Sequence, residues 1–340
     1  MKINYKTIKI FLCLFLFGIV MYGSIWCLDR VLCVKTEHGI LQARNMYDQP
    51  KNSVDVVFMG SSHIHCDVNT ALLWEQYGIA AYDYSAAEQP LWVTYFYLKE
   101  FCKYQNPKLV VLDLYSPARF KEDYQYDWLY DNLAGVKFSL NKLKMLYVSC
   151  EPEYYFDYFP SIGAYHNRYA EVTEEDYEYL FSKRSERQVN KGFTPYFQTR
   201  PQSEPEITQK KSGGITVKSE QYLQKIIEFA QDNDIDLFLI VSPYITTQED
   251  ELVYNRVHEI ADQCGLQFNS TNYFYSEMDL DFDKDFFDES HLNYEGSIKF
   301  TEYLGKELKE KYDLPDRRGL EKWKSWDLHV DEIRQLSGDV

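Results

Sequence analysis

The stretch Val54-Asp-Val-Val-Phe-Met-Gly-Ser-Ser-His63 decides the fold of this chain. Five of its first six residues are apolar and three are valine, which is typical of a buried strand. Gly60 and the small residues Ser61 and Ser62 end the run and predict a tight turn at the edge of a sheet. A serine at such a turn can be reached by a base from elsewhere in the chain, which is what a nucleophile needs.

The segments that follow alternate between strand and helix patterns. Strands are predicted at 79–84, 109–114, 236–242 and 266–269. Helices are predicted at 70–77, 91–104, 219–232, 248–264 and, after the cap Asn293, 294–311. The third strand, Leu109-Val-Val-Leu-Asp-Leu114, has the nearly continuous apolar content of a parallel sheet that is covered on both faces. The alternation predicts an α/β architecture with a mainly parallel sheet.

The domain organisation is read from where this alternation starts, stops and resumes. We expect an α/β domain over 54–116 and 216–312, interrupted by an insertion over 117–215 that is rich in Tyr, Asp and Glu and helical near 139–148. A stalk over 31–53 precedes the domain, and a tail over 313–340 follows it.

The N-terminal region, residues 1–30, is predicted to anchor the chain in a membrane. Ile10 to Cys27 form 18 uncharged, mostly apolar residues, close to the length that spans a bilayer. Lysines precede this run at positions 2, 6 and 9, so the positive-inside rule places the remainder of the chain outside the cytoplasm. A cleaved signal peptide is the alternative. It is disfavoured because no small-x-small cleavage site is present and because Trp26 precedes Cys27.

Composition excludes some classes of partner and site. The formal net charge of -17 argues against nucleic acid, because a phosphate backbone would be repelled. The 30 tyrosines suit either a packed core or stacking on sugars. The seven cysteines contain no CxxC pair and predict neither a disulfide framework nor a zinc site.

A candidate base lies far along the chain, in Phe287-Asp-Glu-Ser-His-Leu-Asn293. The carboxylate of Asp288 and the imidazole of His291 are three residues apart, just before the last long helix. In a loop this spacing lets Asp288 accept from one ring nitrogen while the other takes a proton from Ser62. Both stretches follow predicted strands, so both belong to the ligand-binding edge of a doubly wound sheet.

Gly60-Ser-Ser-His63 after the first strand, with Asp288-x-x-His291 before the last helix, resembles the SGNH (GDSL-type) hydrolase superfamily. The resemblance is strongest to its membrane-anchored extracytoplasmic branch, which works with membrane-bound O-acyltransferases in D-alanylating teichoic acids or acetylating exopolysaccharides. It covers roughly 54–116 and 216–312. It implies a flavodoxin-like sheet, with Ser62 as nucleophile, His291 as base and Asp288 as the residue that orients the base.

The sequence departs from the family pattern around the oxyanion hole. Ser61 stands where the family usually has Asp, no clear counterpart of the second-block glycine occurs in Tyr84 to Pro90, and no Asn follows the third strand. The Ser62 backbone N–H and a donor between Ser85 and Gln89 are the candidates that remain. Losing one such donor costs a hundredfold or more in rate, on the order of 3 kcal/mol. Candidate residues for substrate and oxyanion contacts are Ser61, His63, Ser85 and Gln89.

Two metal readings compete with this interpretation. His63-x-His65, with Cys66 nearby, is a possible metal pair, although His63 suits a role in supporting the turn or lining the pocket better. The acidic ladder at positions 279, 281, 283 and 285 resembles a calcium loop but lacks its mid-loop glycine and terminal Glu. The sequence therefore predicts no metal and no organic cofactor.

The expected activity is O-acyl transfer to, or removal from, a cell-surface glycan or an acyl-carrying polymer, with a membrane-bound O-acyltransferase as a candidate partner. Two alternatives stay open. A secreted esterase or deacetylase would share every catalytic residue. A glycan-binding or assembly protein would keep the fold without the chemistry.

Overall fold

The computed structural model describes residues 5–159 and 165–338, which divide into two compact units. The first unit comprises residues 1–35 and 156–183, and the second comprises 36–155 and 184–340.

The second unit contains the sheet. Its strands are β1 (Val56–Met59), β2 (Ala81–Asp83), β3 (Leu109–Asp113), β4 (Asp236–Val241) and β5 (Phe268–Ser270). All pairings are parallel, and the strand order is β2-β1-β3-β4-β5. This order is that of flavodoxin-like doubly wound folds, so the predicted fold class is confirmed. In such sheets ligands bind outside the carboxyl ends of the strands where the strand order reverses, here between β1 and β3.

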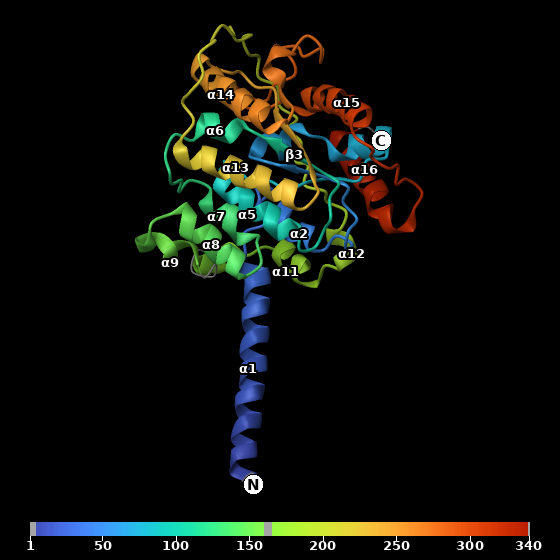
Figure 1. Ribbon diagram of the computed structural model, residues 1–340. Coiled ribbons are helices and arrows are strands. Elements are labelled where there is room, and N and C mark those ends of the chain that lie inside the picture. Colours follow the sequence, from blue (N-terminus) through green and yellow to red (C-terminus); the bar gives the residue numbers. More distant parts are fainter. Residues whose placement is uncertain (1–4, 160–164, 339–340) are drawn as a thin grey trace. The chain divides into compact units, whose positions relative to one another are not determined.

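Helices cover both faces of this sheet. On one side α5 (Leu91–Phe101) packs against α13 (Val217–Asp232), which lies in front of β3 in Figure 1. On the other side α4 (Thr70–Tyr77) packs against α15 (Tyr294–Lys311). The other α-helices that the structure describes wholly within this unit are α2 (Ile40–Met46), α3 (Ser62–Asp67), α6 (Tyr115–Arg119), α7 (Leu129–Ala134), α8 (Leu140–Ser149), α12 (Arg184–Arg187), α14 (Gln248–Cys264) and α16 (Lys324–Ser337).

The central strands β1 and β3 are buried on both faces because β1 is wholly apolar and β3 is apolar up to Asp113. Every residue of β1 and β3 is buried, and one core cluster joins the sheet to α4 and α15. Its members include Val56, Phe58, Leu73, Val111, Phe238, Phe300 and Leu304. Burial of this kind stabilises a domain by roughly 25 cal/mol for each Å² of apolar surface removed from water.

The first unit contains α1 (Tyr5–Leu32) and α11 (Glu174–Phe181). α1 is long and apolar enough to cross a membrane, and helices of this kind occur both as anchors and as signal sequences. Beyond it, Asp176 accepts hydrogen bonds from Lys35 (2.5 Å) and Arg168 (2.9 Å). Although burial alone would raise the pKa of Asp176, these bonds hold it below its ordinary value.

Three segments differ in organisation from the sequence expectation. Residues 36–53, expected as part of a stalk, belong to the second unit, and α2 buries Ile40, Ala43 and Met46 there. The expected insertion is divided between the units, and α9 (Tyr155–Tyr158) lies where they meet along the chain. The expected tail contains α16, which packs on α4 with Trp326 fully buried. The apolar residues of α16 recur at helical spacing, and the face they form packs on α4.

Candidate active site

Ser62 stands at the turn between β1 and α3. Gly60 has a φ of 153°, and a Cβ at this position would lie 2.8 Å from the Cβ of Asp113. Only glycine fits there without strain. Ser61 is in an extended conformation at the N-cap of α3, so Ser62 becomes the first helical residue and remains partly exposed. The backbone N–H of a first helical residue has no acceptor within its helix.

The loop that carries His291 is shaped by Asp288. One carboxylate oxygen of Asp288, Oδ1, accepts from the Ser290 N–H (2.8 Å), the His291 N–H (2.9 Å) and the His291 Nδ1 (3.0 Å). Burial alone would raise the pKa of Asp288, but the hydrogen bond and charge of His291 and the two backbone N–H groups hold it below its ordinary value. Asp288 is therefore suited to remain ionised beside the imidazole.

The structure brings the three predicted catalytic residues together. The Nε2 of His291 lies 2.8 Å from the Oγ of Ser62, across 229 positions of sequence. With Nδ1 donating to Asp288, Nε2 of a neutral ring is the acceptor for the serine proton. The His291 side chain is 18% exposed and that of Asp288 is 30% exposed, so a substrate can reach the group from solvent. Ser62, His291 and Asp288 are therefore hydrogen-bonded in series, in the arrangement that suits a serine nucleophile, a base and a carboxylate.

Asp67, at the end of α3, connects the two halves of this arrangement. Its Oδ1 accepts from the backbone N–H of Leu292 at 3.0 Å, next to His291 in the chain. Asp67 is fully buried, and that burial raises its pKa well above the ordinary value. The helix that begins with Ser62 thus also holds the His291 loop. Sequence reasoning did not identify Asp67.

His63 packs among the rings of Tyr115, Tyr244 and the candidate base His291. Its ring stacks on Tyr115, with centroids 3.7 Å apart, and meets Tyr244 and His291 edge-on at 5.3 Å. His63 is fully buried, and desolvation together with the neighbouring His291 and His65 lowers its pKa well below the ordinary value. A neutral ring in this place supports the wall of the site without competing for the proton.

The other candidate donors make different contacts. The Ser85 hydroxyl is 2.9 Å from Nδ1 of His65, and the Gln89 amide donates to the Thr94 hydroxyl at 2.9 Å. The hydroxyl of Ser61 is buried and has no hydrogen-bond partner among the residues described. The backbone N–H of Ser62, at the first position of α3, remains a candidate oxyanion donor.

A second aromatic wall comes from the segment expected to be an insertion. Tyr196 stacks on Phe287 with centroids 4.1 Å apart and approaches the His291 ring edge-on at 5.8 Å. Its carbonyl accepts from the Tyr294 N–H (2.7 Å), and the Thr194 N–H donates to the carbonyl of His65 (2.6 Å). Sequence analysis missed this contribution, because an extended segment held by backbone bonds has no periodic pattern.

The metal alternatives find no support in the geometry. His65 bonds to Ser85 whereas His63 packs among aromatic rings. In the acidic ladder, Asp285 pairs with Lys299 (2.7 Å) and Asp281 with Lys284 (2.6 Å). Within residues 5–159 and 165–338, no group of three or more His, Cys, Asp or Glu side chains is arranged to hold a metal ion.

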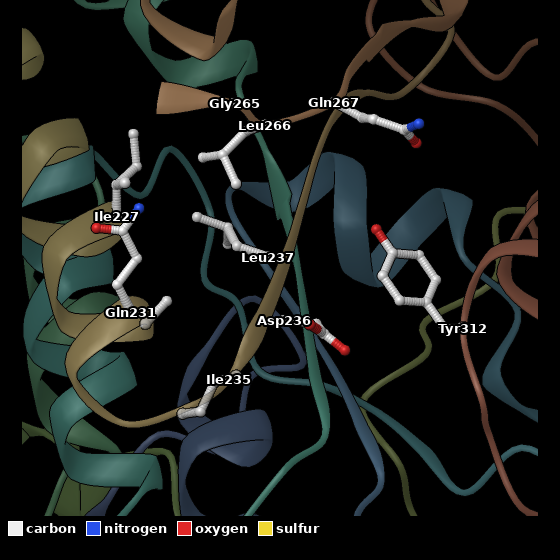
Figure 2. Close-up of a pocket in the computed structure, with 10 residues that line it drawn as sticks. Ile227, Gln231, Ile235, Asp236, Leu237, Gly265, Leu266, Gln267 and Tyr312 are labelled. Carbon is white, nitrogen blue, oxygen red and sulfur yellow. The ribbon is translucent and has the colours of Figure 1, made fainter. Parts of the chain in front are cut away.

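A pocket of about 310 Å³ lies away from this site (Figure 2). Its lining includes Asp236 and Leu237 at the start of β4, and Leu266 and Gln267 just before β5. Because the strands are parallel, this is the edge opposite to the one where Ser62 follows β1. The pocket is therefore not part of the candidate active site.

Comparison with known proteins assigns the chain to a family but assigns no activity. One protein-family model, whose description names no activity, matches residues 44–313. The chain belongs to that family. The matched range takes in the five strands that the structure describes, the Ser62 turn and the His291 loop, but not α16. No curated protein matches the chain.

Among solved structures, the chain is similar to a crystal structure from Bacteroides fragilis described as a "putative acylhydrolase". The two are 13% identical, with a TM-score of 0.40, over 79% of this chain and 94% of the other.

Proposed function

We propose that the protein is a membrane-anchored, extracytoplasmic serine acyl-enzyme of the SGNH type. The observation that carries the proposal is the chain of hydrogen bonds from Ser62 to His291 (2.8 Å) and from His291 to Asp288 (3.0 Å). Its substrate would be an O-acyl group on, or destined for, a cell-surface glycan or polymer. The lysines ahead of the apolar N-terminal run favour this location.

In the first half-reaction, Ser62 Oγ bonds to the acyl carbonyl carbon as Nε2 of His291 takes its proton. Asp288 stabilises the resulting imidazolium. The Ser62 backbone N–H, at the start of α3, would donate to the oxyanion. When the carbonyl re-forms, the leaving alkoxide takes the proton from Nε2, and an acyl-serine ester remains.

In the second half-reaction, His291 deprotonates an incoming hydroxyl. If that hydroxyl belongs to a sugar, the acyl group is transferred, and if it is water, the ester is hydrolysed. The topology favours transfer, with an integral-membrane O-acyltransferase as the source of the acyl group. Neither half-reaction uses a metal or an organic cofactor.

Intact-protein mass spectrometry after treatment with a serine-directed fluorophosphonate tests this proposal. We expect one phosphonyl adduct in the wild type, mapped to the peptide that contains Ser62, and none in Ser62→Ala. Ser61→Ala is a matched control, since it alters the neighbouring hydroxyl but leaves Ser62 and His291 in place. The absence of any adduct on the folded wild type would overturn the proposal.

A second candidate function is glycan binding or assembly without catalysis. It is favoured by the engagement of Ser85 and Gln89 with other side chains, which leaves few oxyanion donors. A binding protein would retain function in Ser62→Ala. A secreted esterase, by contrast, would hydrolyse small p-nitrophenyl esters freely and would lack Met1 in its mature form.

A further inference from the structure

Helix α8 presents apolar side chains on its outer face as well as its inner one. Met145 and Leu146 are buried, and the helix packs on α5. On the opposite side Leu140 is 78% exposed and Tyr147 is 68% exposed, seven residues apart and therefore on the same helix face. The partly exposed Leu143 lies between them, and Phe138, 69% exposed, precedes the helix. An exposed apolar face of this kind marks a contact surface.

The charges around this face are unusual for the chain. No Asp or Glu occurs between Asp131 and Glu151, although the chain has 53 acidic residues and a net charge of -17. In the same segment Lys137 and Lys144 are exposed, with Lys144 beside Leu140, whereas Lys142 is buried and donates to the carbonyl of Val136. An amphipathic helix that combines exposed apolar and basic side chains is typical of the interface between lipid headgroups and acyl chains.

Chain connectivity limits how far this face can lie from the anchor. From Cys27 at the end of the apolar run, the helical stretch to Leu32 and an extended stretch to Thr36 span about 20 Å at most. The Thr36 hydroxyl donates to Asp131 of α7 at 2.6 Å, and α7 packs on α8. The chain length between them therefore allows α8 to reach the surface of a membrane that α1 crosses.

We propose that the outer face of α8, with Phe138, rests on the lipid surface of the leaflet from which the anchor emerges. The inference depends on the anchored topology of the proposed function, but not on its chemistry. Exposed apolar side chains enter the headgroup boundary, and Lys144 meets anionic headgroups. This second attachment limits rotation of the domain about its tether.

Photocrosslinking of the full-length chain tests the proposal. Benzoylphenylalanine replaces Leu140 in one variant and Leu336, a 57% exposed leucine on α16 in the same unit, in a matched control. Each variant is reconstituted into vesicles of phosphatidylglycerol and phosphatidylcholine, irradiated, and analysed by intact mass. We expect a lipid adduct at position 140 at least fivefold above that at 336. Equal yields at the two positions would overturn the proposal.

Two further experiments distinguish contact with lipid from contact with a protein partner. Lys144→Glu is expected to lower the adduct yield at position 140 in vesicles with phosphatidylglycerol, but not in phosphatidylcholine alone. In native membranes, an adduct to a protein of defined mass, without lipid adduct in vesicles, would overturn the proposal in favour of a protein partner. The same spectra report whether the chain begins at Met1, so failure of the anchor is distinguishable from failure of the Ser62 chemistry.

Discussion

At the scale of single residues, the candidate site depends on groups that hold the loop of the base as much as on the base itself. Asp288 fixes the orientation of His291 through its ring nitrogen and its backbone N–H. Asp67 holds the next residue, Leu292, to the helix that starts with Ser62. We therefore expect the 2.8 Å contact between Ser62 and His291 to depend on Asp67, a buried residue that takes no part in the reaction itself.

Asp67→Ala should slow phosphonylation of Ser62 by about 10- to 100-fold. The substitution removes the acceptor of the Leu292 N–H, so the loop that carries His291 is no longer held to α3. Asp67→Asn keeps the accepting oxygen and should remain within a few-fold of the wild type. The measurement is the rate of adduct formation by mass spectrometry. Equal rates in all three proteins would show that Asp67 does not position the base.

Asp113, at the end of β3, should make stability depend on pH. It is buried, accepts from the Ser242 N–H (3.0 Å) and the Tyr115 N–H (3.2 Å), and burial raises its pKa to about 7. Because its folded pKa lies above its ordinary value of 3.8, the folded chain holds a proton that the unfolded chain releases. The free energy of unfolding should then fall, by an amount on the order of a few kcal/mol, as pH rises between those values.

Urea denaturation at pH 5 and pH 8, compared between wild type and Asp113→Asn, measures this effect. The variant loses the titrating group, so its stability should change less between the two pH values. A variant with the same pH dependence as the wild type would contradict the assignment.

At the scale of elements, the β1–turn–α3 unit sets the position of the serine. Gly60 brings the chain against Asp113, and a Cβ there would also lie 3.2 Å from the Ile64 side chain. Gly60→Ala should destabilise the protein by ~3 kcal/mol, since it adds both backbone strain and overpacking. It should also slow labelling of Ser62 by displacing the start of α3. Denaturant unfolding and adduct formation measure the two effects, and an unchanged midpoint with unchanged labelling would refute this explanation.

The elements that could be predicted from sequence are those with a clear pattern. The apolar runs gave β1, β3 and β4, and the parallel arrangement placed Ser62 and His291 at one edge. The extended segment around Tyr196 could not be predicted, because its backbone pairs with distant loops and its side chains follow no period. The side-chain partners of Ser85 and Gln89 depend on local packing that spacing does not encode.

At the scale of the whole molecule, the C-terminal helix belongs to the sheet domain. Trp326 of α16 is fully buried, its indole N–H donates to the carbonyl of Ala81 in β2 (3.1 Å), and the Lys191 ammonium lies 3.8 Å from its ring centroid. Trp326→Ala should cost about 3–5 kcal/mol, because it leaves a large cavity beside an edge strand. Leu336→Ala, at an exposed position of the same helix, should change little. Thermal unfolding of both variants measures the difference, and similar melting temperatures would contradict this account of α16.

The most direct test of the central claim, that His291 activates Ser62, is the rate of fluorophosphonate labelling of Ser62 in wild type, His291→Asn and Asp288→Asn. We predict that His291→Asn slows labelling by roughly 10²- to 10⁴-fold, as expected for loss of a general base. Asp288→Asn should slow labelling as well, because it removes the charge that stabilises the imidazolium. Labelling of folded His291→Asn at the wild-type rate would contradict the account.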